Sequence, residues 1–588
     1  MASCLRGNAK FFIISDSHSD SIKPTGRNRK VPLKPVFHTM PSRVRVSLQQ
    51  LEGEYKAGNR KPLEKVITAF RYIQSLEPEN PNSYFAIAGF HGEPFSGPGA
   101  KDGTWWGGFC NHSNVLFPTW HRAYLLRLED ALRTAPGCED VTVPYLDELW
   151  TVKNPKDDPI PSVLTDKEFA IAGVEDKRNP LYSYRLQKAL KEKVTTADNR
   201  YTKHKGYETV RYPLSGLVGT TQDRYYTDLQ NAKYGPTATQ ELNANVRAWL
   251  HGTAEPVKDD DPNTGYADTY SLIERFRTCL RAPNYTIFSN TASHKQAIED
   301  AGGDPNKDHF IQSLESPHNG IHLSLGGFYQ KGAYDASPIL GANGDMGDNE
   351  TASFDPIFFI HHSFIDLIFW KWQTLNQKTA KGSLDVIEFY PGTVVVEGST
   401  GYAPGTLLTM DSPLYPFKNP KGGYYTPNDM VDIENQLGYT YDERELGTLE
   451  ATPEPKIVGL AKVSNINRAS LTGSFVIRTF AQSQLQQTPL EIGREAVLSR
   501  NNISGCANCQ NFLDIKSYTP IDEALLKKFN GGDPNVTVAF SVVVQDRSGN
   551  LLTPPGEEGD DIPTTPIITF KYWNTKKAEL THGWRSLR

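Results

Sequence analysis

Seven of the fourteen histidines stand in or beside apolar, aromatic-rich segments of the chain. These are His91, His112, His121, His318, His322, His361 and His362. An imidazole without a partner is costly to bury in such surroundings. Neutral imidazole is also a good ligand for copper, zinc and iron. Metal binding is therefore the first chemistry that these residues suggest.

Their spacing sorts six of the seven into two groups of three. His318 and His322 are four residues apart in a segment with a helical pattern, so both rings lie on one helix face. His362, from the next predicted helix, adds a third nitrogen. The other group is formed by His91, His112 and His121. Because no carboxylate stands at ligand spacing in either group, we expect two all-imidazole sites, which suit a copper pair with room for O2 between them.

Two other interpretations remain open at this point. A single histidine on an apolar helix face is more often a hydrogen-bonded core residue than a ligand. The His318–His322 pair fits zinc as well, although the catalytic Glu of an HExxH motif is absent.

Helices have to position these rings. The apolar pattern predicts helices over Tyr84–His91, Phe117–Arg133, 309–325 and 355–376. On the second of these, His121 shares a face with Leu125 and Leu128 and so points into the core. Helices that project ligands toward one another form a bundle with an internal metal site.

Composition limits the class of protein. The chain has 588 residues and a net charge of −6, which predicts several domains and gives no reason to expect nucleic acid or an anionic membrane as partner. No apolar run is long enough to cross a bilayer. The first residues show no secretory pattern, so we expect a cytoplasmic protein. Six cysteines in this length do not form a disulfide framework.

The pattern changes along the chain. Residues 150–305 are polar and are interpreted as a long excursion between two halves of a core. Residues 446–455 (LGTLEATPEP) have the composition of a linker. Beyond them, alternation over 474–480, 536–544 and 567–573 predicts strands. We therefore expect a mainly α core over 1–445, in which a four-helix bundle with long loops holds the metals, and a separate β-rich domain over 456–588.

Two motifs are similar to those of the type-3 copper family, which comprises tyrosinases, catechol oxidases and molluscan-type hemocyanins. The first, H-x4-F-x-x-W-H-R with a later Glu, is met by His112, Phe117, Trp120, His121, Arg122 and Glu129. The second, D-P-x-F-x3-H-x3-D, is met by Asp355, Pro356, Phe358, His362 and Asp366. The resemblance covers about residues 40–445. Tyr439-Thr-Tyr441 resembles the Tyr-x-Tyr that closes the family's core.

The resemblance implies a ligand set. One copper takes His91, His112 and His121, and the other takes His318, His322 and His362. It gives His361 and Asp366 supporting roles beside the ligands. It also implies a thioether between Cys110 and His112, which would fix the ring of a ligand that comes from a loop. One departure stands out: the family's Pro-Tyr-Trp-Asp-Trp reads Pro144-Tyr145-Leu146-Asp147-Glu148 here.

The resemblance also implies a reaction. A monophenol is hydroxylated beside its oxygen, and the resulting diphenol is oxidised to an o-quinone with O2. Phenols have a pKa near 10, so a base is useful, and Glu315 and Asn319 match residues that hold a basic water in related enzymes. The alternatives are a catechol or o-aminophenol oxidase without monophenolase activity, and a hemocyanin-like oxygen carrier. As partners we expect O2 and small phenols, and the sequence also allows a homo-oligomer.

The part beyond the linker resembles the C-terminal domain of latent fungal-type tyrosinases, which covers the active site. Cys506 and Cys509 match a CxxC linked to copper delivery in some of those domains, and soft thiolates select Cu(I). Two unlinked thiols in a turn are the alternative. The residues around Val497 and Leu498 are the candidates for a side chain that plugs the pocket.

Overall fold

The computed structural model describes most of the chain from Arg43 onward. The described ranges are 43–92, 108–191, 202–252, 271–302, 311–327, 341–395, 401–444, 457–471, 473–500, 512–547, 566–572 and 585–586, with the single residues 446, 449, 503 and 509. The residues from Pro41 to Arg588 form one compact unit, in which a helical part and a β-rich part pack together.

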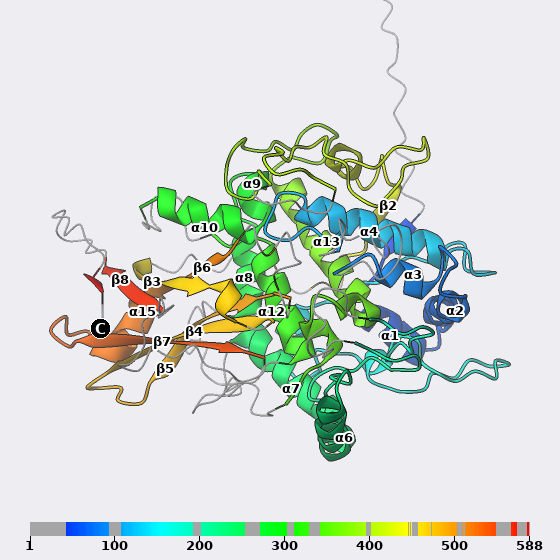
Figure 1. Cartoon of the computed structure of the whole chain (residues 1–588), viewed down its shortest axis with the longest axis horizontal. Coiled ribbons are helices and arrows are strands. Elements are labelled where there is room, and N and C mark those ends of the chain that lie inside the picture. Colours follow the sequence, from blue (N-terminus) through cyan, green and yellow to red (C-terminus); the bar gives the residue numbers. More distant parts are fainter. Residues whose placement is uncertain are drawn as a thin grey trace, which may run out of the picture. The chain divides into compact units, whose positions relative to one another are not determined.

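Two helices at the centre of the helical part, α4 (Phe117–Leu132) and α13 (Ile357–Leu375), pack against each other (Figure 1). Pro118 stands in the first turn of α4, where its missing N–H costs nothing. Helix α13 is buried over nearly its whole length because its sequence is apolar on all sides. A side-chain oxygen of Asp355 accepts a hydrogen bond from the Ile357 amide at the start of this helix (3.1 Å).

Other helices surround this pair. α1 (Leu48–Lys56) packs on α2 (Lys61–Ser75), which packs on α4 and on α3 (Tyr84–Ala88). α12 (Glu315–Gly326) packs on α7 (Ala238–His251) and α8 (Leu272–Cys279). Gly320 of α12 permits the close approach of α8, because a Cβ there would lie 2.4 Å from Leu272 Cδ2. The remaining helices are α5 (Trp150–Lys153), α6 (Thr221–Tyr234), α9 (Tyr285–Ser289) and α10 (Thr291–Asp300).

Two short strands, β1 (Arg43–Arg45) and β2 (Tyr439–Tyr441), pair in parallel. They join the first described residues of the chain to the end of the helical part. The Tyr-x-Tyr motif is the second of these strands.

The β-rich part contains two sheets. One has the order β6-β3-β8-β9 and the other β5-β4-β7. The strands are β3 (Ile457–Asn467), β4 (Phe475–Ser483), β5 (Leu490–Val497), β6 (Asp514–Asp522), β7 (Val538–Asp546), β8 (Ile567–Tyr572) and β9 (Arg585–Ser586). Residues such as Val463, Ile477 and Ile568 from the two sheets share one apolar cluster, so the sheets pack face to face. Helix α15 (Glu523–Asn530) follows β6.

The expected fold class, a mainly α core with a β-rich C-terminal part, is confirmed. The helix over Tyr84–His91 is shorter than expected, because it ends at Ala88 and leaves His91 beyond it. The polar region 150–305, expected to be a long connection between two halves of the core, contributes to the core itself, because it contains α7 and α8, which pack on α12. Apart from Leu446 and Leu449, the predicted linker lies outside the described residues, so the domain boundaries stay a prediction. Among the described helices, none is both long and apolar enough to span a membrane.

Candidate metal centre

The imidazoles of the first group converge at one point. Helix α4 carries His121, while His91 follows α3 and His112 lies in the loop before α4. Their ring centroids are 5.4 Å apart for His91–His112, 5.4 Å for His112–His121 and 5.9 Å for His91–His121. Three segments that are distant in sequence thus bring three rings together.

The second group lies beside the first. The ring centroid of His318 is 4.5 Å from that of His322 and 4.8 Å from that of His362. The Nε2 atoms of His318 and His362 are 3.3 Å apart, the spacing expected when both lie about 2 Å from one ion. His121 of the first group stacks on His362 at 4.4 Å. The two groups therefore form one continuous cluster of six rings.

Hydrogen bonds at the opposite nitrogen orient the rings. The Nδ1 atoms of His91, His121 and His322 lie 2.8–3.1 Å from the backbone carbonyls of Asn349, Phe117 and Met346. A carbonyl can only accept, so each Nδ1 donates and each Nε2 keeps its lone pair. This is the arrangement of metal-binding histidines, whose other ring nitrogen is hydrogen-bonded.

The lone pairs of these rings have no hydrogen-bond partner. In the described part of the chain, the buried Nε2 atoms of His91, His112, His121 and His322 are without one. Burial lowers the pKa of every ring in the cluster, to about 3 for His121 and His322. Buried neutral imidazoles with unsatisfied acceptor atoms are the donor set that a soft or borderline metal needs. The residues present therefore fit a pair of copper ions.

His361 is closer to the site than the sequence indicated. Its ligand atom lies within 4.8 Å of those of His318, His322 and His362. The Nδ1 atom of His361 is 2.5 Å from Oε1 of Glu148, and its Nε2 has no hydrogen-bond partner. Burial raises the pKa of Glu148 and lowers that of His361 to about 3. Glu148 stands where the copper family usually has Trp, so this carboxyl–imidazole pair occupies the place where the sequence departs from the family motif.

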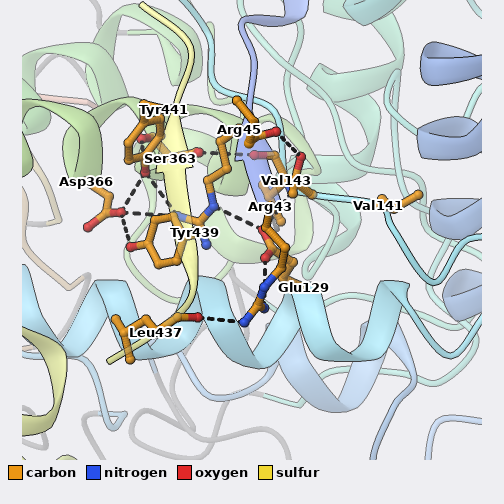
Figure 2. Close-up of polar contacts among 12 residues, drawn as sticks. Arg43, Arg45, Glu129, Val141, Val143, Ser363, Asp366, Leu437, Tyr439 and Tyr441 are labelled. Carbon is orange, nitrogen blue, oxygen red and sulfur yellow. Dashed lines mark hydrogen bonds and ion pairs between the residues drawn. The ribbon is translucent and has the colours of Figure 1, made fainter. Parts of the chain in front are cut away.

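Asp366 lies in a buried polar network one turn beyond His362 on α13 (Figure 2). Its Oδ2 accepts hydrogen bonds from the hydroxyls of Tyr439 and Tyr441, both at 2.6 Å. Its Oδ1 is 2.5 Å from Nε of Arg122, the residue after His121 on α4. Although burial opposes ionisation most strongly, the charges of Arg122 and Arg45 hold the pKa of Asp366 below its usual range.

Arg45 completes this network. Its guanidinium contacts Asp366 at 3.1 Å and Glu129 at 3.0 Å, and all three side chains are buried. Figure 2 shows Arg45, Asp366 and Glu129 grouped around β2, close to α4. Arg122, Glu129 and Asp366, which belong to the two family motifs, therefore act together to hold the ligand-bearing helices α4 and α13 in place.

Cys110 lies beside the ligands of the first group. It is fully buried, and its Sγ is within 4.8 Å of the ligand atoms of His91 and His112. Asn349 Nδ2 lies 3.8 Å from this sulfur. Proximity to His112 is what a thioether requires, and the crosslink itself stays a prediction.

Glu315 and Asn319 line the cavity beside His112, but each has partners of its own. Glu315 accepts hydrogen bonds from the amides of Ser113 and Thr291, both at 2.8 Å. Burial raises the pKa of this carboxyl, while those donors oppose the shift. Asn319 Oδ1 lies 2.9 Å from Nδ1 of His318 and orients that ring. Both residues are thus close to the ligands, and their role as holders of a basic water stays a prediction.

Part of the β-rich region covers this site. Val497 and Leu498, at the end of β5, line the same cavity as His112, and Leu498 packs against the apolar core of the helical part. These are the residues expected to plug the pocket, and that role stays a prediction. Cys509 also lines the cavity and is disulfide-bonded. Cys506 lies outside the described residues, and copper delivery through this motif stays a prediction that needs the reduced thiols.

Buried ion pairs hold the two parts together. Glu495 of β5 contacts Arg275 of α8 and Lys295 of α10, both at 2.9 Å. Arg547, which follows β7, contacts Asp348 at 2.5 Å and donates to the carbonyls of Gly326 and Gly344. The sequence analysis did not predict these contacts. It also did not predict that Arg45 bridges Glu129 and Asp366, that the Asn349 carbonyl orients His91, or that Glu148 pairs with His361. No local pattern marks them, because their partners are far away in the chain.

Comparisons with known proteins agree with this geometry. The family model for the common central domain of tyrosinase matches residues 81–375. The chain is 45% identical to a tyrosinase, HcTyr2, from Hahella sp. over 82% of this chain and 88% of the relative. It is 39% identical to a tyrosinase from Aspergillus oryzae over 79% of this chain and 87% of the relative. Among solved structures, a Burkholderia thailandensis tyrosinase at low pH aligns with a TM-score of 0.70 and 40% identity, covering 85% of this chain and 94% of that chain.

The fold and the histidine cluster define a type-3 copper oxidase. With these relatives and a family match of this extent, the chain belongs to the tyrosinase family and is an enzyme of that family. Members of the family have a dicopper site and act on phenols with O2. The interpretation as an oxygen carrier is therefore set aside.

Proposed function

We propose that this chain hydroxylates monophenols to o-diphenols and oxidises o-diphenols to o-quinones with O2. The observation that carries the proposal is the convergence of six neutral imidazoles. Among the described residues, the Nε2 atoms of four of them have no hydrogen-bond partner, and those of the other two, His318 and His362, lie 3.3 Å from each other. His91, His112 and His121 would hold one copper, and His318, His322 and His362 the other. When bound, the two ions would supply the capacity to bind and reduce O2.

The residues of the chain itself position the phenol and accept its proton. Once the β-rich part is displaced, the cavity beside His112 would give the phenol ring access to the cluster from one side. A phenol loses its proton on reaching the site, so a nearby acceptor assists the reaction. Glu315, whose pKa is raised by burial, and Asn319 border this cavity and are the proposed holders of the accepting water.

Latency is the second part of the proposal. Val497 and Leu498 of the β-rich part border the cavity, and Leu498 packs on the core. A phenol ring cannot reach the imidazoles through space that these side chains fill. The full chain should therefore be weakly active until the β-rich part is displaced.

The test combines copper analysis with turnover of a monophenol and a diphenol before and after limited proteolysis near residues 446–455. We expect two copper ions per chain and turnover of both substrates that rises at least tenfold after cleavage. In the cleaved enzyme, Asn319→Asp should change the ratio of monophenol to diphenol turnover more than it changes copper content. Diphenol turnover alone would support the catechol oxidase alternative. Equal loss of both activities in Asn319→Asp at full copper loading would remove its role in proton transfer.

A further inference from the structure

A cavity lies between the helical part and the β-rich part, next to the histidine cluster. The helical part contributes His112, Glu315 and Asn319, and the β-rich part contributes Arg468, Val497 and Leu498. Its volume is about 70 Å³. Since one water needs roughly 10–15 Å³ of such space, the cavity accommodates several waters or a small polar group even when the β-rich part is in place.

Arg468 is a buried cation in this cavity, and it has no counterion among the described residues. It lies in the short turn after β3, and 7% of the residue is exposed. Its Nε has no hydrogen-bond partner, and among the described residues no carboxylate lies within ion-pair distance of its guanidinium. Burial lowers the pKa of Arg468 to about 10, so the group still carries its charge at neutral pH. A buried charge that is not paired is costly.

The neighbouring carboxylates are already engaged. The charge of Glu315 acts on Arg468 from a distance, but both of its oxygens accept hydrogen bonds from Ser113 and Thr291. Glu495 is paired with Arg275 and Lys295. Neither is placed to neutralise the guanidinium, so the missing partner has to come from outside the described chain.

A second arginine adds to the positive charge on this side. Arg500, which is 1% exposed, has no hydrogen-bond partner at Nε or Nη2 within the described part of the chain. Its charge and that of Arg468 both lower the pKa of His112. Two guanidiniums from the β-rich part thus act on the same imidazole.

We propose that the covered form of the enzyme binds a monocarboxylate on Arg468, between the β-rich part and His112. The planar guanidinium matches a carboxylate through two parallel hydrogen bonds. Of the two arginines, only Arg468 lines the cavity, so one negative charge matches it. Val497 and Leu498 give the short hydrocarbon part of such a ligand an apolar surface.

This site has a consequence for regulation. Arg468 belongs to the β-rich part, while His112 and Glu315 belong to the helical part, so the complete site exists only when the two parts are packed together. A ligand that binds one state only shifts the equilibrium toward it. Carboxylates should therefore favour the covered form. This step rests on the proposed latency, whereas binding to Arg468 does not depend on turnover.

The test is calorimetric titration of the full-length protein with three probes: acetate, 3-(4-hydroxyphenyl)propionate and the amide of that acid. We expect acetate, which is small enough for the cavity, to bind the unaltered protein and Arg468→Gln to bind it at least tenfold more weakly. Arg468→Lys should retain part of the affinity, and Arg444→Gln, which alters an exposed arginine paired with Asp442, should change nothing. The amide should bind equally to the unaltered protein and to Arg468→Gln.

The probes also distinguish the source of the carboxylate. Binding of acetate points to a free monocarboxylate, and binding of the phenolic acid alone points to the carboxylate of a substrate. Unchanged affinity of Arg468→Gln for both carboxylates would overturn the proposal, as would equal binding of acid and amide. The thermal midpoint of each variant without ligand verifies that it is folded. Because binding is measured without turnover, loss of the proposed oxidase activity would leave this result intact.

Discussion

At the level of single residues, the neutral state of the imidazoles distinguishes this site from an ordinary histidine cluster. Burial keeps all of them uncharged, and backbone carbonyls fix the Nδ1 proton of three. A cluster of this kind, in which the Nε2 atoms of His91, His112, His121 and His322 have no partner among the described residues, would cost free energy in a protein that bound no metal. Two features thus indicate metal binding: the number of imidazole rings, and the tautomer that leaves the Nε2 lone pair of three of them directed at the site.

Glu148 is the residue whose change should be most informative. Its carboxyl is 2.5 Å from His361 and has no counterpart in the usual family motif. His361 is not one of the six proposed ligands, but its ring nitrogen lies within 4.8 Å of those of three ligands. Loss of a polar partner around a metal site typically lowers metal affinity by about 10- to 100-fold. We expect Glu148→Gln to lower copper affinity within that range and to alter the copper(II) electron paramagnetic resonance spectrum. Competition with a chelator measures the affinity.

The matched control for this change is Glu443→Gln. Glu443 pairs with Lys371 of α13, the helix that carries His361, and both side chains are partly exposed. Copper affinity should therefore remain as in the unaltered protein. If Glu148→Gln kept both the affinity and the spectrum, His361 would be a packing residue with no influence on the metal.

The sequence predicted the metal ligands better than it predicted the residues that contact them. All six proposed ligands lie in one cluster, because motif spacing directly constrains residues within a helix and its adjoining loop. The pairing of Glu148 with His361 joins residues 213 positions apart. Only the departure from the family motif at 144–148 drew attention to that segment, and it indicated a difference without indicating the contact.

At the level of elements, the helix periodicity was sufficient to find α4, α12 and α13, and the strand alternation found β4, β7 and β8. It missed β3, β5 and β6, of which β5 matters most because it packs on α12. Charged residues such as Glu491, Arg494 and Glu495 interrupt the apolar pattern of β5. They are buried because they pair with one another and with Arg275, Lys295 and Arg478. An alternation rule treats such residues as exposed.

The network around Asp366 gives a prediction at this scale. Asp366→Asn keeps the shape of the side chain but removes the charge that compensates Arg45 and Arg122, both buried. Breaking a buried ion pair costs about 3–5 kcal/mol, so the free energy of unfolding of the metal-free protein should fall by that amount. Urea unfolding followed by tryptophan fluorescence measures it.

An exposed ion pair provides the comparison. Glu79→Gln removes the partner of Lys188 at the surface, where ion pairs contribute little, and should leave the urea midpoint unchanged. A midpoint for Asp366→Asn equal to that of Glu79→Gln would mean that the network orients α4 and α13 without stabilising them.

At the level of the whole molecule, the helical and β-rich parts are joined by contacts of two kinds. Apolar residues such as Leu498 pack on the core, and buried charges meet across the boundary. The apolar contacts are independent of pH, whereas the charged ones are not. Under the proposed latency, the balance between them would determine under which conditions the site becomes accessible.

Glu495 allows this balance to be tested. Although burial opposes its charge most strongly, Lys295 and Arg275 lower the pKa of its carboxyl to about 2, from an ordinary value of 4.5. A pKa lowered in the packed form means that Glu495 stabilises packing fully above pH 4.5 and loses this effect as the pH falls toward 2. We therefore expect hydrogen exchange in residues 490–497, corrected for its intrinsic pH dependence, to rise between pH 4.5 and 3. In Glu495→Gln, exchange should already be faster at pH 6, and the rise in acid should be smaller. An equally large rise in that variant would show that other groups govern the separation of the two parts, and that the pairing of Glu495 with Lys295 and Arg275 only orients β5.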